Sequence, residues 1–182
     1  ILWTHDTGGA PLRRLPRHAA HWLAVHEERL RRRSDLRPGM PWWSLFRTPS
    51  ANREQPRVVW TDVAREPHVV VLEAGDPTVA LNSCYVLRCA EPDDARALAV
   101  LLRSPVCAAW LRALAEPARG GYLRHLAWTV ALLPMPRNWL RARRALLAMK
   151  DGAGPARHAN IAARAYGLTL DVVAPLVEWG AV

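Results

Sequence analysis

The residues best suited to binding chemistry lie within residues 118–136, where a basic and glycine-rich segment precedes an apolar run. Adjacent glycines permit a positive φ and the close approach of another backbone. This pattern predicts a bendable loop that presents cations and an aromatic ring to phosphates or bases. Taken alone, the stretch is more typical of an ordinary glycine turn before a buried strand. The residues concerned are Arg119, Gly120, Gly121, Tyr122 and Arg124.

The apolar run that follows is expected to anchor this loop. Residues 126–133 are almost entirely apolar and are predicted to form a buried strand. Pro134 and Pro136 limit that strand, because proline lacks the N–H group that a central strand donates to its neighbour.

Two further parts of the sequence present arginines that are expected at the surface. Residues 41–46 are rich in aromatics and are predicted to pack as a core plug that holds Arg47 at the surface. A second group of arginines lies just before and within a helix expected over residues 138–150. Its arginines suit phosphate contact, but a charged helix face is also commonly just solvated. They are Arg137, Arg141, Arg143 and Arg144.

Signatures of several common catalytic centres are missing. The sequence contains no GxxxxGK[ST] loop, no GxGxxG after a strand, no HExxH and no GxSxG. Asp93 and Asp94 are interpreted as helix-start residues rather than as an acid and base pair. His18 and His21 lack a third ligand at a recognised spacing, so we interpret them as surface histidines. The pattern favours a binding module over a catalytic one.

The elements that position these residues indicate an α/β (α+β-like) fold. β-branched and aromatic runs at residues 57–60, 68–73 and 83–89 predict one small, mostly antiparallel mixed sheet, because the connections are short. Residues 1–4 are expected to add a short strand. Helical spacing of apolar residues predicts helices that pack on the sheet and form a C-terminal extension, over residues 16–33, 93–102, 104–114, 138–150, 155–166 and 169–179.

Charge favours an anionic partner. The chain has 25 Lys/Arg and 16 Asp/Glu, a net charge of +9 and a pI near 10.8. The net charge is +4 over residues 1–40, −2 over residues 41–100 and +7 over residues 101–182, so the positive charge lies on the two flanks. Only Lys150 is a lysine. Arginine suits phosphate and guanine edges, although a GC-rich genome would enrich arginine without any functional cause.

Length and composition predict one domain of ordinary size, or one domain plus a small appendage, since 51% of the 182 residues are apolar. The three cysteines have no CxxC spacing, which argues against a disulfide framework or a zinc site and favours a reducing cytoplasm. No signal peptide and no apolar run of about 18 residues is evident, so no membrane association is expected. Because the chain begins with Ile1 rather than methionine, we expect a further segment upstream.

Five stretches in order resemble the C-terminal target-recognition region of TaqI-like N6-adenine DNA methyltransferases, which also occurs in fused restriction-modification enzymes. The resemblance covers roughly residues 1–136, and residues 137–182 match least well. It implies DNA-binding roles for Arg47, Arg119, Gly120, Gly121, Tyr122 and Arg124. The stretches are residues 41–47, 57–75, 81–89, 97–111 and 119–136.

In that family an N-terminal Rossmann-like domain binds S-adenosylmethionine and uses an N-P-P-Y-type motif on a flipped adenine. This sequence contains neither that motif nor a glycine-rich cofactor loop, so it resembles only the recognition part. We therefore expect a DNA target-recognition domain at residues 1–136 and a basic helical extension at 137–182. The expected partners are double-stranded DNA and an upstream catalytic domain that holds S-adenosylmethionine, with no cofactor in this segment.

Two other interpretations remain open at this point. The chain is alternatively a protein-interaction or structural module whose basic flanks have no nucleic-acid role, or a specificity subunit without a fused catalytic domain. Salt-dependent duplex binding separates the first alternative from the DNA-binding interpretations.

Overall fold

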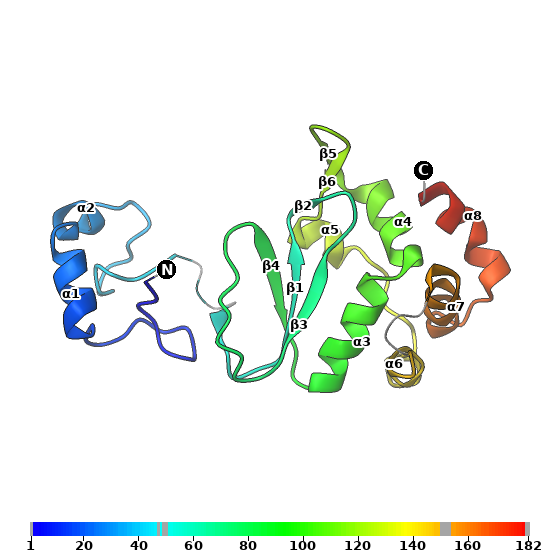
Figure 1. The fold of residues 1–182 in the computed structure, drawn as a ribbon, viewed down its shortest axis with the longest axis horizontal. Coiled ribbons are helices and arrows are strands. Elements are labelled where there is room, and N and C mark those ends of the chain that lie inside the picture. The colour runs from blue at the N-terminus through cyan, green and yellow to red at the C-terminus, as the bar shows by residue number, and fades with distance from the viewer. Residues whose placement is uncertain (1, 47, 49–50, 150–153, 181–182) are drawn as a thin grey trace. The chain divides into compact units, whose positions relative to one another are not determined.

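The computed structural model describes residues 2–46, 48, 51–149 and 154–180 (Figure 1). The chain divides into two compact units, Ile1–Glu54 and Gln55–Val182. Within the described residues, eight helices and two three-stranded antiparallel sheets form. The predicted mixed α/β class is therefore confirmed.

Two short helices build the first unit, α1 (Arg17–Ala24) and α2 (Glu27–Arg31). The continuous helix predicted over residues 16–33 is wrong, because the chain turns between them. The new helix start is favourable because Glu27 and Glu28 lie at the positive end of the α2 dipole, and each pairs with the arginine four residues later.

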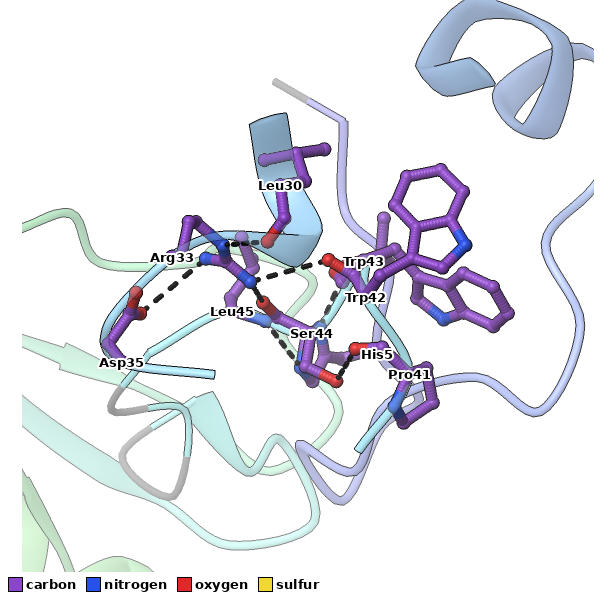
Figure 2. Close-up of polar contacts among 10 residues, drawn as sticks. His5, Leu30, Arg33, Asp35, Pro41, Trp42, Trp43, Ser44 and Leu45 are labelled. Carbon is purple, nitrogen blue, oxygen red and sulfur yellow. Dashed lines mark hydrogen bonds and ion pairs between the residues drawn. The ribbon is translucent and has the colours of Figure 1, made fainter. Parts of the chain in front are cut away.

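Arg33 is the polar centre of this unit (Figure 2). Its guanidinium donates to the carbonyl oxygens of Leu30 at 3.2 Å, Trp42 at 3.4 Å and Ser44 at 2.5 Å, and it lies 3.5 Å from the carboxylate of Asp35. These contacts join the end of α2 to the aromatic loop. Arg33 therefore has a structural role in this unit.

The predicted aromatic plug forms only in part. Trp42 is buried and packs edge-on against Trp43, whose Nε1 donates to the carbonyl oxygen of Leu12 at 3.0 Å. The assignment of Phe46 to the plug is wrong, since its side chain is 56% exposed. The next residue, Arg47, lies outside the described residues, so its predicted surface position is not tested.

The strand predicted over residues 1–4 is wrong for the described residues 2–4. A single bridge joins His5 to Pro11, and no neighbouring pairs extend it into a ladder. Thr4 is held instead by its hydroxyl, which donates to the carbonyl oxygen of Trp43 at 2.9 Å.

The first sheet of the second unit contains all three predicted strands. They are β1 (Arg57–Thr61), β3 (Val69–Leu72) and β4 (Cys84–Arg88), in the order β3-β1-β4 with antiparallel pairing. β1 is the central strand and is almost entirely buried. The predicted antiparallel arrangement is confirmed.

Helix α3 (Pro92–Leu102) packs against β1 and β3, and α4 (Pro105–Leu114) follows it. Asp93 and Asp94 lie in the first turn of α3, as predicted. Ser104 caps α4, because its hydroxyl oxygen accepts the backbone N–H of Cys107 at 3.2 Å. Both predicted helix starts are confirmed.

The C-terminal helices are α6 (Trp139–Leu147), α7 (Pro155–Ala165) and α8 (Leu170–Gly180). The predicted helical C-terminal extension is confirmed. It shares one apolar core with α3 and α4, built mainly from small residues that allow the helices to approach closely. Members of this core from the five helices include Ala97, Leu101, Cys107, Ala142, Leu146, Ala162 and Val173.

A second, smaller sheet was not predicted. It comprises β2 (Val63–Ala64), β5 (Glu116–Ala118) and β6 (Tyr122–Arg124), in the order β2-β6-β5. Its strands have two or three residues, too short for an alternating pattern to stand out in the sequence. β5 and β6 form the hairpin at the top of the second unit in Figure 1.

The strand predicted over residues 126–133 is wrong, because the run contains helix α5 (Ala127–Ala131). Val130 and Leu133, three residues apart, pack against the core of the first sheet, whereas Trp128 and Leu132, four apart, are exposed. This helical spacing of buried and exposed residues replaces the alternation that a strand requires.

No helix in the described ranges is by itself long and apolar enough to cross a membrane. Only α3 and α4 taken together meet a length and composition test, and they are bent by 69° at their junction.

Candidate nucleic-acid interface

The predicted glycine loop is the tip of the β5–β6 hairpin. Ala118 pairs with Tyr122, which leaves Arg119, Gly120 and Gly121 as the connecting loop. The two glycines have φ values of 77° and 76°, in the left-handed region where residues with a Cβ are strained. Glycine therefore suits both positions, as predicted. The side chain of Arg119, in the same loop, is exposed.

One face of the hairpin sheet is aromatic and charged. Tyr122 and Arg124 alternate with Leu123 along β6, so their side chains lie on the same face. The guanidinium of Arg65 lies over the ring of Tyr122, with its carbon 5.7 Å from the ring centroid. The hairpin thereby brings Tyr122, Arg65 and Arg124 together, with Arg119 at its tip. We call these four residues the hairpin cluster.

Asp62 fixes the position of Arg124. The Nη2 of Arg124 donates to Oδ2 of Asp62 at 2.7 Å, and its Nε donates to Oδ1 at 3.3 Å. The hydrogen bond and the negative charge of Asp62 raise the pKa of Arg124 above its ordinary value. Arg124 therefore stays charged and is held in one orientation at the sheet surface.

Buried polar contacts attach the hairpin to the first sheet. The backbone N–H of His125 donates to the carbonyl oxygen of Asp62 at 2.6 Å, and the buried indole of Trp60 donates to the carbonyl oxygen of His125 at 2.8 Å. The His125 side chain is also buried, and burial lowers its pKa. Both contacts lie at the end of β6, so they hold the base of the hairpin against the first sheet.

The arginines near α6 divide into two kinds. Arg137, Arg141 and Arg144 are exposed at spacings of four and three residues, and we call them the α6 arginines. Arg143 instead donates to the carboxylate of Asp94 at 2.9 Å, beside a 2.8 Å hydrogen bond from the Trp139 indole. The Trp139 hydrogen bond and the Arg143 guanidinium lower the pKa of Asp94. Arg143 therefore ties α6 to α3 and is not equivalent to its neighbours.

The structure does not bring the two basic groups together. Figure 1 shows the β5–β6 hairpin and α6 at opposite ends of the second unit. The hairpin cluster and the α6 arginines are consequently separate candidate surfaces. Arg47, the remaining predicted contact, lies outside the described residues.

Sequence reasoning missed Asp62 and Arg65. Both lie around β2, which pairs with β6 across about 60 positions of the chain. The local sequence around them, TDVAREP, contains no motif that indicates this pairing. The sequence shows that Asp62 and Arg65 are charged. Only the pairing of β2 with β6 shows that they lie beside Arg124 and Tyr122.

The described residues offer no assembled metal site, since no three His, Cys, Asp or Glu side chains form a suitable group among them. A hollow of 550 Å³ is lined by parts of α4, α7 and α8. Its His158 donates from Nε2 to the carbonyl oxygen of Val100 at 2.7 Å, and burial lowers the pKa of this histidine. His158 is thus used by the fold, and the hollow supports no cofactor assignment.

Comparison with known proteins adds no family assignment. No protein-family model and no curated protein sequence matches the chain.

Proposed function

We propose that this chain is the DNA-binding target-recognition segment of a site-specific N6-adenine DNA methyltransferase of the restriction-modification type. The observation that carries the proposal is the hairpin cluster, in which three arginines and one tyrosine gather on and beside the β5–β6 hairpin. The major groove of duplex DNA admits a two-stranded ribbon, and the hairpin has two strands where it extends beyond β2, at the pair of Ala118 and Tyr122. The sequence resemblance names the enzyme class.

In this proposal the residues of the hairpin cluster have different roles. Arg119 at the tip and Arg65 beside it supply cations for phosphates, which fix the register of the duplex. Tyr122 offers a flat surface against the sugar or base edge. Gly120 and Gly121 let the hairpin backbone approach the groove closely, because no side chain lies between it and the DNA.

The chemistry belongs to the upstream catalytic domain. That domain would hold S-adenosylmethionine and receive the flipped adenine, while this segment holds the duplex and selects the site. No residue described above has a role in methyl transfer. The reaction takes place in the cytoplasm, in keeping with the three free cysteines.

The test is duplex binding by the full chain, measured by fluorescence anisotropy over a range of salt concentrations. We expect binding that weakens with salt, and a log K against log salt slope that flattens by about 0.9 for each phosphate contact removed by Arg119→Gln or Arg65→Gln. Tyr122→Ala should weaken binding without changing the slope, since it removes no charge.

Arg164→Gln is the matched control, because Arg164 is an exposed arginine on α7 and its replacement removes the same charge. The proposal fails if the chain does not bind duplex DNA at low salt. It also fails if Arg164→Gln flattens the slope as much as the two hairpin variants do, since binding would then depend on net charge alone.

A second candidate function is a protein-interaction module, favoured by one observation. An apolar hollow of 320 Å³ lies between β4, α3 and the α5 region, and its lining includes Leu87 and Met135, which are both exposed. Exposed apolar surface of this kind is typical of protein contacts. Leu87→Ser would leave DNA binding intact if the hollow serves a protein partner, whereas it would weaken DNA binding if the hollow belongs to the DNA surface.

A further inference from the structure

The pair formed by Asp62 and Arg124 has a specific geometry. The carboxylate lies along one edge of the guanidinium, where it accepts from Nε and Nη2. The Asp62 side chain is only 15% exposed, whereas that of Arg124 is 42% exposed. The carboxylate is therefore the inner partner and the guanidinium the outer one.

A guanidinium has five N–H donors in one plane, and this pairing uses two of them. The edge formed by Nη1 and Nη2 takes no part in this pairing, and 42% of the Arg124 side chain is exposed. This edge carries two parallel donors that suit a ligand with two acceptors in the same plane. Glu116 faces Arg124 from β5 and adds negative charge to this face, but no ion pair joins the two in the described structure.

Among the base edges in the major groove, guanine alone presents two adjacent acceptors, N7 and O6. Adenine presents one acceptor and one donor, cytosine presents a donor, and thymine presents an acceptor and a methyl group. A fixed pair of donors therefore matches guanine and leaves an unmatched donor against the other bases.

The surroundings hold this donor pair still. Arg124 lies in the central strand β6. The next residue, His125, donates its backbone N–H to the carbonyl oxygen of Asp62 and accepts the indole N–H of Trp60 at its own carbonyl oxygen. Asp62 restricts the orientation of the guanidinium by two hydrogen bonds, which disfavours its turning toward a phosphate, the commoner partner of an arginine on a DNA-binding surface. A mobile arginine would bind any sequence, whereas a fixed one distinguishes bases.

We propose that Arg124, oriented by Asp62, recognises one guanine in the major groove of the target site. This inference rests on the proposed function and adds to it the identity of one base. Arg119 and Arg65 supply sequence-independent affinity, and the pair supplies sequence preference at one position.

The experiment is a selection of bound duplexes from a randomised pool by the full chain. We expect the wild-type chain to enrich a motif that contains a guanine. Arg124→Gln should no longer select that guanine, but it should keep the base preferences at the other positions of the motif. Asp62→Asn should relax the preference at the same position, because its amide places an NH2 donor where the carboxylate has one of its two acceptor oxygens. Arg119→Gln is the control, and it should lower affinity while keeping the whole motif.

A second measurement changes the DNA, so its main result comes from the wild-type chain and does not depend on the stability of a variant. Replacing that guanine by 7-deazaguanine removes the N7 acceptor and should weaken binding by the wild-type chain by about tenfold. The same replacement should have no effect on Arg124→Gln.

The outcomes separate the two proposals. A chain that binds no duplex overturns the proposed function and this inference with it. If the chain binds duplex in a salt-dependent way, three results would overturn the inference alone. They are a motif without a guanine, an unchanged motif in Arg124→Gln, and unchanged binding to DNA that contains 7-deazaguanine.

Discussion

Arg143 and Arg144 are adjacent on α6 but have different surroundings, and this makes their replacement informative. Arg143 pairs with Asp94, with both side chains 26% exposed, whereas Arg144 is exposed like Arg137 and Arg141. We expect the α6 arginines to affect only DNA binding and Arg143 to affect only stability. The perturbations are the triple replacement of the α6 arginines by glutamine and the single variant Arg143→Gln.

The size of each effect follows from these surroundings. If all three α6 arginines contact phosphates, their loss flattens the slope of log K against log salt by about 0.9 each, or about 2.7 together. Between about 50 and 200 mM salt this slope corresponds to about 40-fold in K. The unfolding free energy of the triple variant should stay within about 0.5 kcal/mol of wild type, because exposed positions rarely contribute more.

Arg143→Gln should lower the unfolding free energy by about 1 kcal/mol. The pair with Asp94 is partly buried, so its loss costs more than that of a fully exposed pair and less than that of a buried one. The hydrogen bond from the Trp139 indole remains and limits the loss. The salt dependence of DNA binding should not change.

The assays are anisotropy titrations of a labelled duplex at several salt concentrations, and urea unfolding at pH 7. At this pH the Asp94 carboxylate is ionised, since its pKa lies below the ordinary 3.8. An unchanged slope and affinity in the triple variant would assign the α6 arginines to a solvated helix face. A flattened slope in Arg143→Gln would refute the separation of the two kinds of arginine.

Three further predictions concern the fold and its acid sensitivity. Ser104→Ala should lower the unfolding free energy by about 1 kcal/mol in urea unfolding, since it removes the cap of α4. Gly121→Ala and Gly75→Ala should each cost about 1 kcal/mol, because both positions have a positive φ and open space, but only Gly121→Ala should also weaken duplex binding. Burial lowers the pKa of His125 and His158 below 6.5, so the unfolded chain binds more protons as the pH falls below about 6.5. The unfolding free energy should therefore decrease from about pH 6.5 toward the folded pKa values, and His125→Gln should reduce this decrease; an equal decrease in that variant would assign the acid sensitivity to other groups.

The parts of the fold that could be predicted depend on local sequence. β1, β3 and β4 are β-branched runs between turn residues, and Ser104 followed by proline is a helix start that needs no distant partner. Each of these signals lies within a few residues of the element it predicts. The C-terminal helices were predictable for the same reason.

The parts that could not be predicted depend on distant pairing or on a choice between periods. β2 has two residues and exists because β6 lies beside it. Residues 126–133 are apolar almost throughout, so the sequence does not show whether alternate residues or residues three and four apart face the core. The structure shows the second spacing, with Val130 and Leu133 inward and Trp128 outward.

The arginines show most clearly what the sequence leaves undetermined. Arg119 and Arg124 are five residues apart in one loop motif, and Arg143 and Arg144 are neighbours, so composition treats each pair as equivalent. A carboxylate 62 residues from Arg124 and another 49 residues from Arg143 make them different. Asp94 holds Arg143 in a contact between α6 and α3, whereas Asp62 pairs with one edge of the Arg124 guanidinium and leaves the other edge unused. Affinity for DNA and preference for a base are therefore expected to reside in different arginines, and a variant that removes one should leave the other measurable.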